Sequence, residues 1–74
     1  MKTQKNIKQL TNEQLVSSHA RLRVDAKVNM TTEHDENMTL IEIEYIGRNY
    51  HKLIANPKYL DYLRKWEYEY NLNS

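Results

Sequence analysis

The chain has 74 residues, with eleven lysines and arginines against ten aspartates and glutamates, and it has no cysteine. A chain of this length holds one domain with one small core, and the missing cysteines exclude a disulfide framework or a thiolate zinc site. A formal net charge of +1 excludes the strong field of a protein that coats nucleic acid or imitates it. Because no apolar run approaches the roughly 18 residues of a membrane span, we predict a cytoplasmic protein without membrane contact.

The N-terminal segment, residues 1–10, is polar and basic. Only Ile7 and Leu10 can anchor it to a core, so we expect a flexible basic N-terminus. The rest of the chain, residues 11–74, is expected to form a single α+β domain.

A helix is predicted directly after this segment. Thr11 and Gln14 have the spacing of a capping box, in which each side chain accepts a hydrogen bond from the backbone N–H of the other residue. We therefore predict a helix that begins at Asn12. Ser17 and Ser18 are poor helix formers, and they predict that this helix is short.

Two alternating segments follow. Residues 20–30 alternate between apolar and polar side chains without interruption, and residues 39–45 form a second alternating run, in which Leu40 blurs the polar side. Successive side chains of a strand point to opposite faces, so the alternation predicts strands with one apolar and one charged face. The acidic stretch between them, residues 31–37, predicts a hairpin connection. Pairing the two strands sets basic side chains of the first beside glutamates of the second, which favours the pairing.

The last third of the chain predicts a third strand and a covering helix. Residues 47–49 contain the only glycine and form a turn, and residues 50–55 return as a strand. Asn56 and Pro57 are typical of a helix start, and the helix is expected to continue to about Asn71. The predicted fold is α+β, with a short N-terminal helix, a three-stranded antiparallel meander and a C-terminal helix packed on the sheet. Its expected core is Val24, Ala26, Val28, Ile41, Ile43, Leu53, Leu63 and Trp66.

A three-helix bundle is the alternative. It makes residues 12–30 one helix and residues 38–55 a second, on which Leu40, Ile43, Gly47, Tyr50 and Ile54 have heptad spacing. We rank it second because it would leave Val24 and Val28 on a polar face of the helix, and because β-branched residues favour a sheet.

No residue pattern typical of catalysis, metal binding or cofactor binding is present. The three histidines, at positions 19, 34 and 51, are scattered without the spacing of metal ligands. Glu42 and Glu44 are the only paired carboxylates on a rigid predicted element, and nearby cations would keep them ionised. The sequence also contains no glycine-rich loop. We therefore predict that the protein is not an enzyme and that it has no catalytic residues, no metal and no cofactor.

The predicted order of helix, three strands and helix resembles the double-stranded RNA-binding domain across nearly the whole chain. The chain departs from that family at residues 33–36, which form an acidic stretch where the family has a Gly-Pro-His type loop. An acidic loop repels the groove that it would enter. The same order is similar to that of some small phage-encoded inhibitors of bacterial defence or transcription, including certain anti-CRISPR proteins.

The aromatic residues give the best indication of function. Six tyrosines and one tryptophan exceed what a small core needs, and tyrosine beside arginine is common in protein interfaces. We predict a small regulatory protein, similar in type to the phage-encoded inhibitors, that binds and blocks a protein partner. The predicted partner-binding residues are Arg48, Tyr62, Arg64, Lys65, Tyr68 and Leu72. Nucleic-acid binding through the scattered lysines and arginines is the alternative, and a homodimer is compatible with either.

Overall fold

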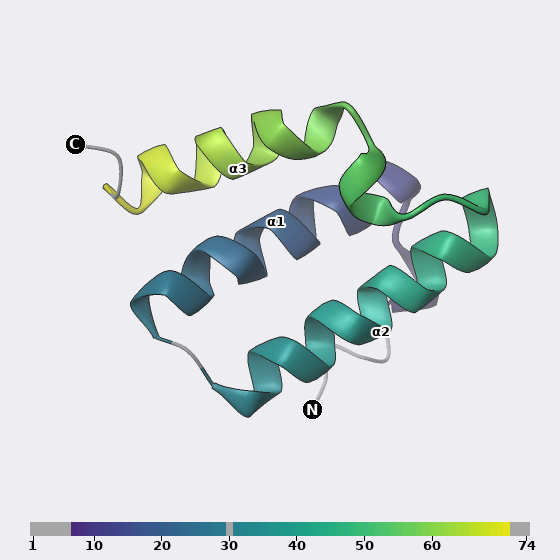
Figure 1. Ribbon diagram of the computed structural model, residues 1–74, viewed down its shortest axis with the longest axis horizontal. Coiled ribbons are helices and arrows are strands. Elements are labelled where there is room, and N and C mark those ends of the chain that lie inside the picture. Colours follow the sequence, from purple (N-terminus) through teal and green to yellow (C-terminus); the bar gives the residue numbers. More distant parts are fainter. Residues whose placement is uncertain (1–6, 30, 72–74) are drawn as a thin grey trace.

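The computed structural model describes residues 7–29 and 31–71, and within these ranges it contains helices and no strand (Figure 1). Helix α1 covers Asn12–Val28, α2 covers Thr32–Asn49 and α3 covers Lys58–Glu69, and a 3-10 helix, η2, covers Leu53–Ala55. The predicted α+β fold with a three-stranded sheet is therefore wrong, and the fold is a bundle of three helices. None of these described helices is long and apolar enough to cross a membrane.

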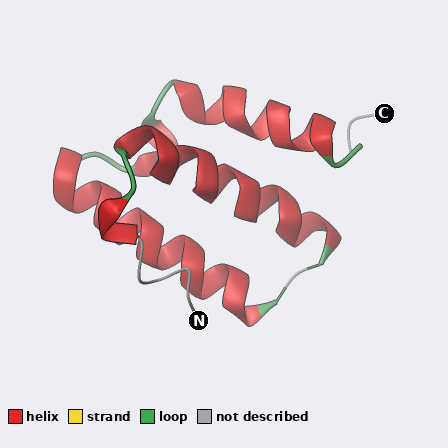
Figure 2. Ribbon diagram, turned by 180° about the vertical axis from the view of Figure 1, so that it is seen from behind, coloured by secondary structure: helices red, strands yellow, loops and turns green. Residues whose placement is uncertain are grey.

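Helix α1 lies between α2 and α3 and makes most of the contacts between helices (Figure 1). The backbone extends over 36 × 28 × 16 Å along its principal axes. Because an α-helix with its side chains is about 10–12 Å across, the three helices form a single layer. Helices α2 and α3 are the two edges of this layer, and the view from behind shows the same order (Figure 2).

The predicted strand at residues 20–30 falls largely within the second half of α1. Val16, Ala20 and Val24 are buried, and because they are four residues apart they share one face of the helix. An alternating run always contains residues four apart, so its apolar positions can line a helix as well as a strand. Val28, at the end of the helix, remains exposed.

The predicted second strand, residues 39–45, lies entirely within α2. The buried residues of this helix are Asn37, Ile41 and Tyr45, which again are four residues apart. Ile43, which the sheet would have buried, is 62% exposed. The helical period therefore decides which side chains face the core, and the β-branched residues do not prevent a helix here.

The predicted hairpin connection and turn also belong to α2. Thr31 caps the helix by accepting a hydrogen bond from the backbone N–H of His34 at 3.2 Å, and the acidic residues that follow suit a helix N-terminus. Gly47 lies inside α2. The helix ends at Asn49, and its C-cap residue Tyr50 has a left-handed backbone with φ of 61°. The predicted third strand at residues 50–55 is wrong, because the only regular element there is η2 at Leu53–Ala55.

The predicted start of the first helix at Asn12 is confirmed, but the prediction that this helix is short is wrong, because α1 continues to Val28. The last helix begins one residue later than predicted, at Lys58, with Pro57 as its N-cap. The Thr11 hydroxyl accepts from the Gln14 backbone N–H at 3.1 Å, and the Gln14 side chain accepts from the Thr11 backbone N–H at 2.9 Å. Before α3, the Asn56 side chain accepts from the backbone N–H of Lys58 at 2.8 Å. Asn56 also donates to the Tyr45 hydroxyl at 2.9 Å, so the start of α3 is tied to α2.

The core lies between the helices and a short 3-10 turn at residues 7–9. Its buried cluster consists of Ile7, Leu15, Val16, Ala20, Ile41, Tyr45, Leu53 and Tyr59, and the partly buried Leu10, Leu22, Tyr62, Leu63 and Trp66 pack against it. Val24, Ile41 and Leu53 of the predicted core are buried, whereas Val28 and Ile43 are exposed. Ile7 and Leu10 anchor the end of the N-terminal segment, whose residues 1–6 lie outside the described part.

The resemblances to the double-stranded RNA-binding domain and to the phage inhibitors depended on an order of helix, three strands and helix. The helical fold removes that basis. Neither family's properties are carried over to this chain.

Candidate protein-binding surface

The outward side of α2 is apolar. After Asn37, every exposed residue of α2 and its C-cap is uncharged, while the three charged residues of the same stretch are half-buried. The exposed residues, which we call the α2 outer face, are Thr39, Leu40, Ile43, Ile46, Gly47 and Tyr50. A surface helix normally directs its charged residues to solvent. The reversed arrangement makes this side of α2 the candidate binding surface.

The α2 outer face points away from α1. Ile43 follows the buried Ile41 by two residues, so the two side chains lie about 160° apart around the helix. Tyr50, at the end of the same side, is 87% exposed. The heptad from Leu40 to Tyr50, which the alternative sequence interpretation assigned to the bundle, therefore faces outward with no helix of the described chain opposite it.

A groove runs beside this face. It has a volume of about 280 Å³ and is lined by Ile7, Lys8, Leu40, Ile43 and Glu44. One wall is the 3-10 turn at residues 7–9 and the other is α2. The groove is therefore continuous with the α2 outer face, because Leu40 and Ile43 belong to both.

Arg48 holds the wall of this groove in place. Its guanidinium donates to the backbone carbonyls of Ile7 at 3.3 Å, of Lys8 at 2.9 Å and of Leu10, and its Nε donates to Glu44 at 2.9 Å. Arg48 is half-buried, and most of its donors are used inside the fold. Its predicted role in partner binding stays a prediction, and α1 lies between α2, which carries Arg48, and α3, which carries four of the other predicted residues (Figure 1).

Helix α3 carries most of the other predicted partner-binding residues. Arg64, Lys65 and Tyr68 are exposed, and their spacing of three and four residues brings them together on one side of the helix. Tyr68 is 73% exposed, and Leu72 lies outside the described residues. Charged residues make up most of this side, as is usual for a helix that faces solvent.

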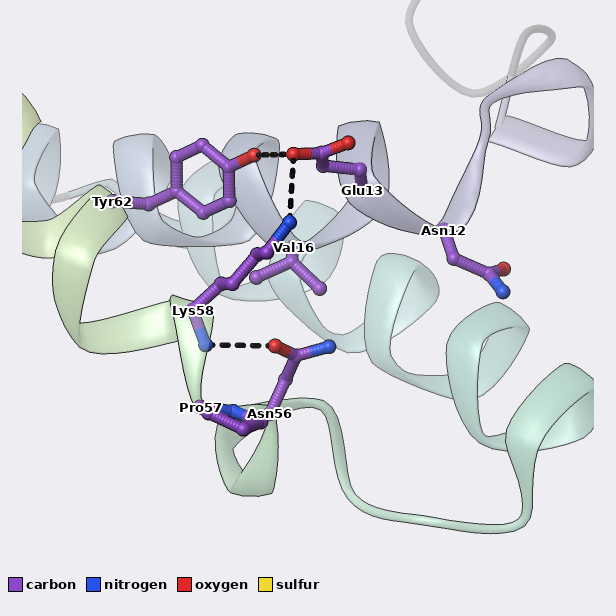
Figure 3. A pocket seen from close by; sticks show the side chains of 7 residues that line it. All are labelled: Asn12, Glu13, Val16, Asn56, Pro57, Lys58 and Tyr62. Carbon is purple, nitrogen blue, oxygen red and sulfur yellow. Dashed lines mark hydrogen bonds and ion pairs between the residues drawn. The ribbon is translucent and has the colours of Figure 1, made fainter.

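Tyr62 points toward α1 instead (Figure 3). Its hydroxyl donates to Glu13 at 2.7 Å, and the Lys58 ammonium lies 3.5 Å from the same carboxylate oxygen. These residues line a hollow of about 380 Å³ where α1 and α3 begin. The hydrogen bond from Tyr62 and, next, the charge of Lys58 hold the pKa of Glu13 below its usual value. Glu13 belongs to α1, whereas Tyr62 and Lys58 belong to α3, so these contacts join the two helices.

The other titratable groups with a displaced pKa also join helices. His19 is buried, with its Nδ1 3.0 Å from the Tyr59 hydroxyl, and burial lowers its pKa. A hydrogen bond from His34, with Nε2 and Oδ2 2.5 Å apart, is the main cause of the lowered pKa of Asp25. The described residues contain no group of three or more metal-ligating side chains.

Several cations of the described chain are paired with acidic side chains. Lys27 lies 2.7 Å from a glutamate of α3, and Lys58 is paired with a glutamate of α1. The cations of Arg21 and Lys65 each lie 5.2 Å from the ring centroid of Trp66. The pairing of the two lysines with carboxylates weakens the field that phosphates would meet. Nucleic-acid binding stays a prediction.

Comparison of the chain with protein-family models, with curated proteins and with solved structures finds no match. The candidate surface therefore depends on geometry alone. The sequence interpretation missed the α2 outer face because the predicted sheet placed Ile43 in the core. The signal that could have found it is the heptad spacing from Leu40 to Tyr50 without a charged residue at any heptad position.

Proposed function

We propose that the chain is a non-enzymatic regulatory protein that acts by binding another polypeptide chain, with the α2 outer face as its docking surface. One observation carries the proposal: over three turns of α2, every exposed residue is uncharged and the charged residues lie at the sides. Apolar residues that protrude without a neighbour cost free energy in water, and a partner that covers them recovers it.

The spacing of the docking surface favours a helix as the ligand. Leu40, Ile43, Gly47 and Tyr50 follow the a and d positions of a heptad, which are the positions that pack against a second helix. The groove beside Leu40 and Ile43 suits a large side chain of that helix, in the way that amphipathic helices place anchors into grooves.

The displaced pKa values support a binding protein over an enzyme. Such values mark catalytic groups when they lie in a cleft without a structural explanation. Here the shifted groups are paired across helices, as with Glu13 and Tyr62 or Asp25 and His34. Their shifts are explained by the packing of the bundle.

Site-specific photo-cross-linking tests the proposal. A benzophenone side chain is placed at position 43 of the full chain, and a matched variant carries it at Asp61, which is exposed on α3. After irradiation in the source cell, the cross-linked peptide is identified by mass spectrometry. We expect position 43, and not position 61, to attach to an apolar segment of a helix, either of another protein or of a second copy of the chain.

Two outcomes would contradict the proposal. One is the absence of a protein adduct at position 43, and the other is equal labelling at both positions, which would mean that the α2 outer face is ordinary solvent-exposed surface.

A further inference from the structure

We infer that the helix covering the α2 outer face is the α2 helix of a second copy of this chain, packed antiparallel; this inference rests on the proposed function of that face. Three features of the molecule support this: the order of side chains along the face, the groove at one end, and the charges at the two ends of the helix.

The order of side chains is self-complementary. About a two-fold axis level with Tyr45, Ile43 of one copy lies opposite Gly47 of the other, and Leu40 lies opposite Tyr50. This register pairs a positions with d positions, as antiparallel helices require. Large residues then face small or flat ones. Apart from its chain neighbours and the backbone of its own helix, nothing lies within 4 Å of a Cβ placed on Gly47, so the glycine leaves open space for the Ile43 side chain of the second copy.

The groove can accommodate the side chain of Tyr50, the most exposed residue of the face. Tyr50 is 87% exposed, and in the antiparallel register it reaches Leu40 of the second copy. Leu40 lines the groove of about 280 Å³ together with Ile7 and Ile43. A tyrosine that fills such a groove is a typical interface anchor, and two-fold symmetry makes this contact twice.

The charges favour the antiparallel orientation over the parallel one. The first turns of α2 carry the exposed carboxylates of Glu33, Asp35 and Glu36, and the segment after the helix carries the exposed ammonium of Lys52. Antiparallel packing brings the acidic end of one copy near the basic end of the other. Parallel packing brings the acidic ends together, which is unfavourable.

The single layer gives α2 room for a second neighbour. Helix α1 is flanked on both sides, whereas α2 is an edge of the layer (Figure 1). Pairing through α2 leaves the side of α3 that carries Arg64, Lys65 and Tyr68 uncovered in each copy.

Sedimentation equilibrium of the purified full chain tests the inference. We expect a dimer at micromolar concentrations, and we expect Ile43→Glu to weaken it at least about thirtyfold, because a charge replaces a central apolar contact. Leu60→Glu, at an exposed position of α3, is the matched control and should leave the dimer intact. Helical circular dichroism confirms that each variant folds. A wild-type monomer up to high micromolar concentrations, or an intact Ile43→Glu dimer, would overturn the inference.

Disulfide formation tests the register. The chain has no cysteine, so Ile43→Cys and Gly47→Cys variants, distinguished by an isotope label, can be mixed and oxidised. The antiparallel register predicts that the mixed disulfide between the two variants dominates. Disulfides only within each variant would indicate parallel packing and would overturn the inferred arrangement.

The failure of this inference is distinguishable from failure of the proposed function. A monomeric chain whose position 43 still cross-links to a helix of another protein keeps the docking surface and rejects the second copy. A monomeric chain without any adduct at position 43 rejects both.

Discussion

Individual polar residues join the helices, and His19 makes folding sensitive to pH. Its side chain is buried against Tyr59, and burial lowers its pKa in the folded state. The unfolded chain therefore binds a proton at this position at a higher pH than the folded chain does. Protonation then favours unfolding, so the contribution of His19 is complete above about pH 6.5 and is lost as the pH falls below that value.

Urea unfolding at about pH 7.5 and about pH 5 measures this effect. We expect the free energy of unfolding to fall toward acid in the wild type, and to fall less in His19→Gln, which cannot gain the proton. His51→Gln, at an exposed position, is the matched control and should keep the wild-type dependence. An identical pH dependence in all three proteins would contradict this account.

Arg48 is predicted to act on stability through the N-terminal turn. Three backbone carbonyls between Ile7 and Leu10 accept hydrogen bonds from its guanidinium. Arg48→Ala removes all of these donors, and we expect a loss of roughly 1–3 kcal/mol in the free energy of unfolding. Arg48→Lys should recover only part of the loss, because one ammonium does not reproduce the planar fork of donors. Equal stability of Arg48→Ala and the exposed variant Arg64→Ala, measured by urea unfolding, would show that the turn contributes little.

Within α2, a substitution at Gly47 distinguishes the stability of the helix from the packing of its outer face against a second copy. The residue lies inside the helix, and a Cβ there meets nothing within 4 Å apart from its chain neighbours and the backbone of its own helix. In the monomeric Ile43→Glu background, we expect Gly47→Ala to raise the free energy of unfolding by up to about 1 kcal/mol, because alanine is the better helix former. In the wild-type background the added methyl group occupies the space assigned to Ile43 of the second copy.

Gly47→Ala should therefore raise the free energy of unfolding of the monomeric variant and weaken self-association in the wild-type background. Stability is measured by urea unfolding and self-association by sedimentation. A variant that is both more stable and more strongly dimeric would mean that Gly47 lies away from the interface.

The two helix starts were predictable from the local sequence. Whether the segments between them form helices or strands was not. The capping box at Thr11 and the Asn56 side chain act within three residues, so the sequence contains the whole interaction. The alternation of residues 20–30 is ambiguous, because residues four apart share a face in a strand and in a helix. The packing of α1 against α2 and α3 decides between the two, and that packing is not local.

The candidate surface was hidden for the same reason. Ile43 is equally suitable for a core and for an interface, and only the position of α1 shows which side of α2 is outward. Tyr68 could be placed on the outside from the helical period alone, since α3 was predicted as a helix. Tyr62 also needed a tertiary contact, its hydrogen bond to Glu13.

At the scale of the whole molecule, self-association makes thermal stability depend on concentration. Two folded copies that bind each other are stabilised by mass action relative to the unfolded chain. We expect the Tm to rise by a few degrees for each tenfold increase in protein concentration. The Ile43→Glu variant should have a constant Tm. A constant Tm in the wild type as well would contradict dimerisation, and scanning calorimetry at several concentrations distinguishes the cases.

The central position of α1 also sets a hierarchy of motion. Helices α2 and α3 each pack against α1 (Figure 1), so either one can open while the other remains docked, but α1 is released only when both are lost. Amide protons of α1 between Leu15 and Val24 should therefore exchange with deuterium most slowly, at a rate close to that of global unfolding. Those of α3 should exchange earlier. In this hierarchy α1 stays folded until global unfolding, whereas α2 and α3 can each open locally. Native-state hydrogen exchange in the presence of low denaturant would measure the separate exchange rates of the three helices.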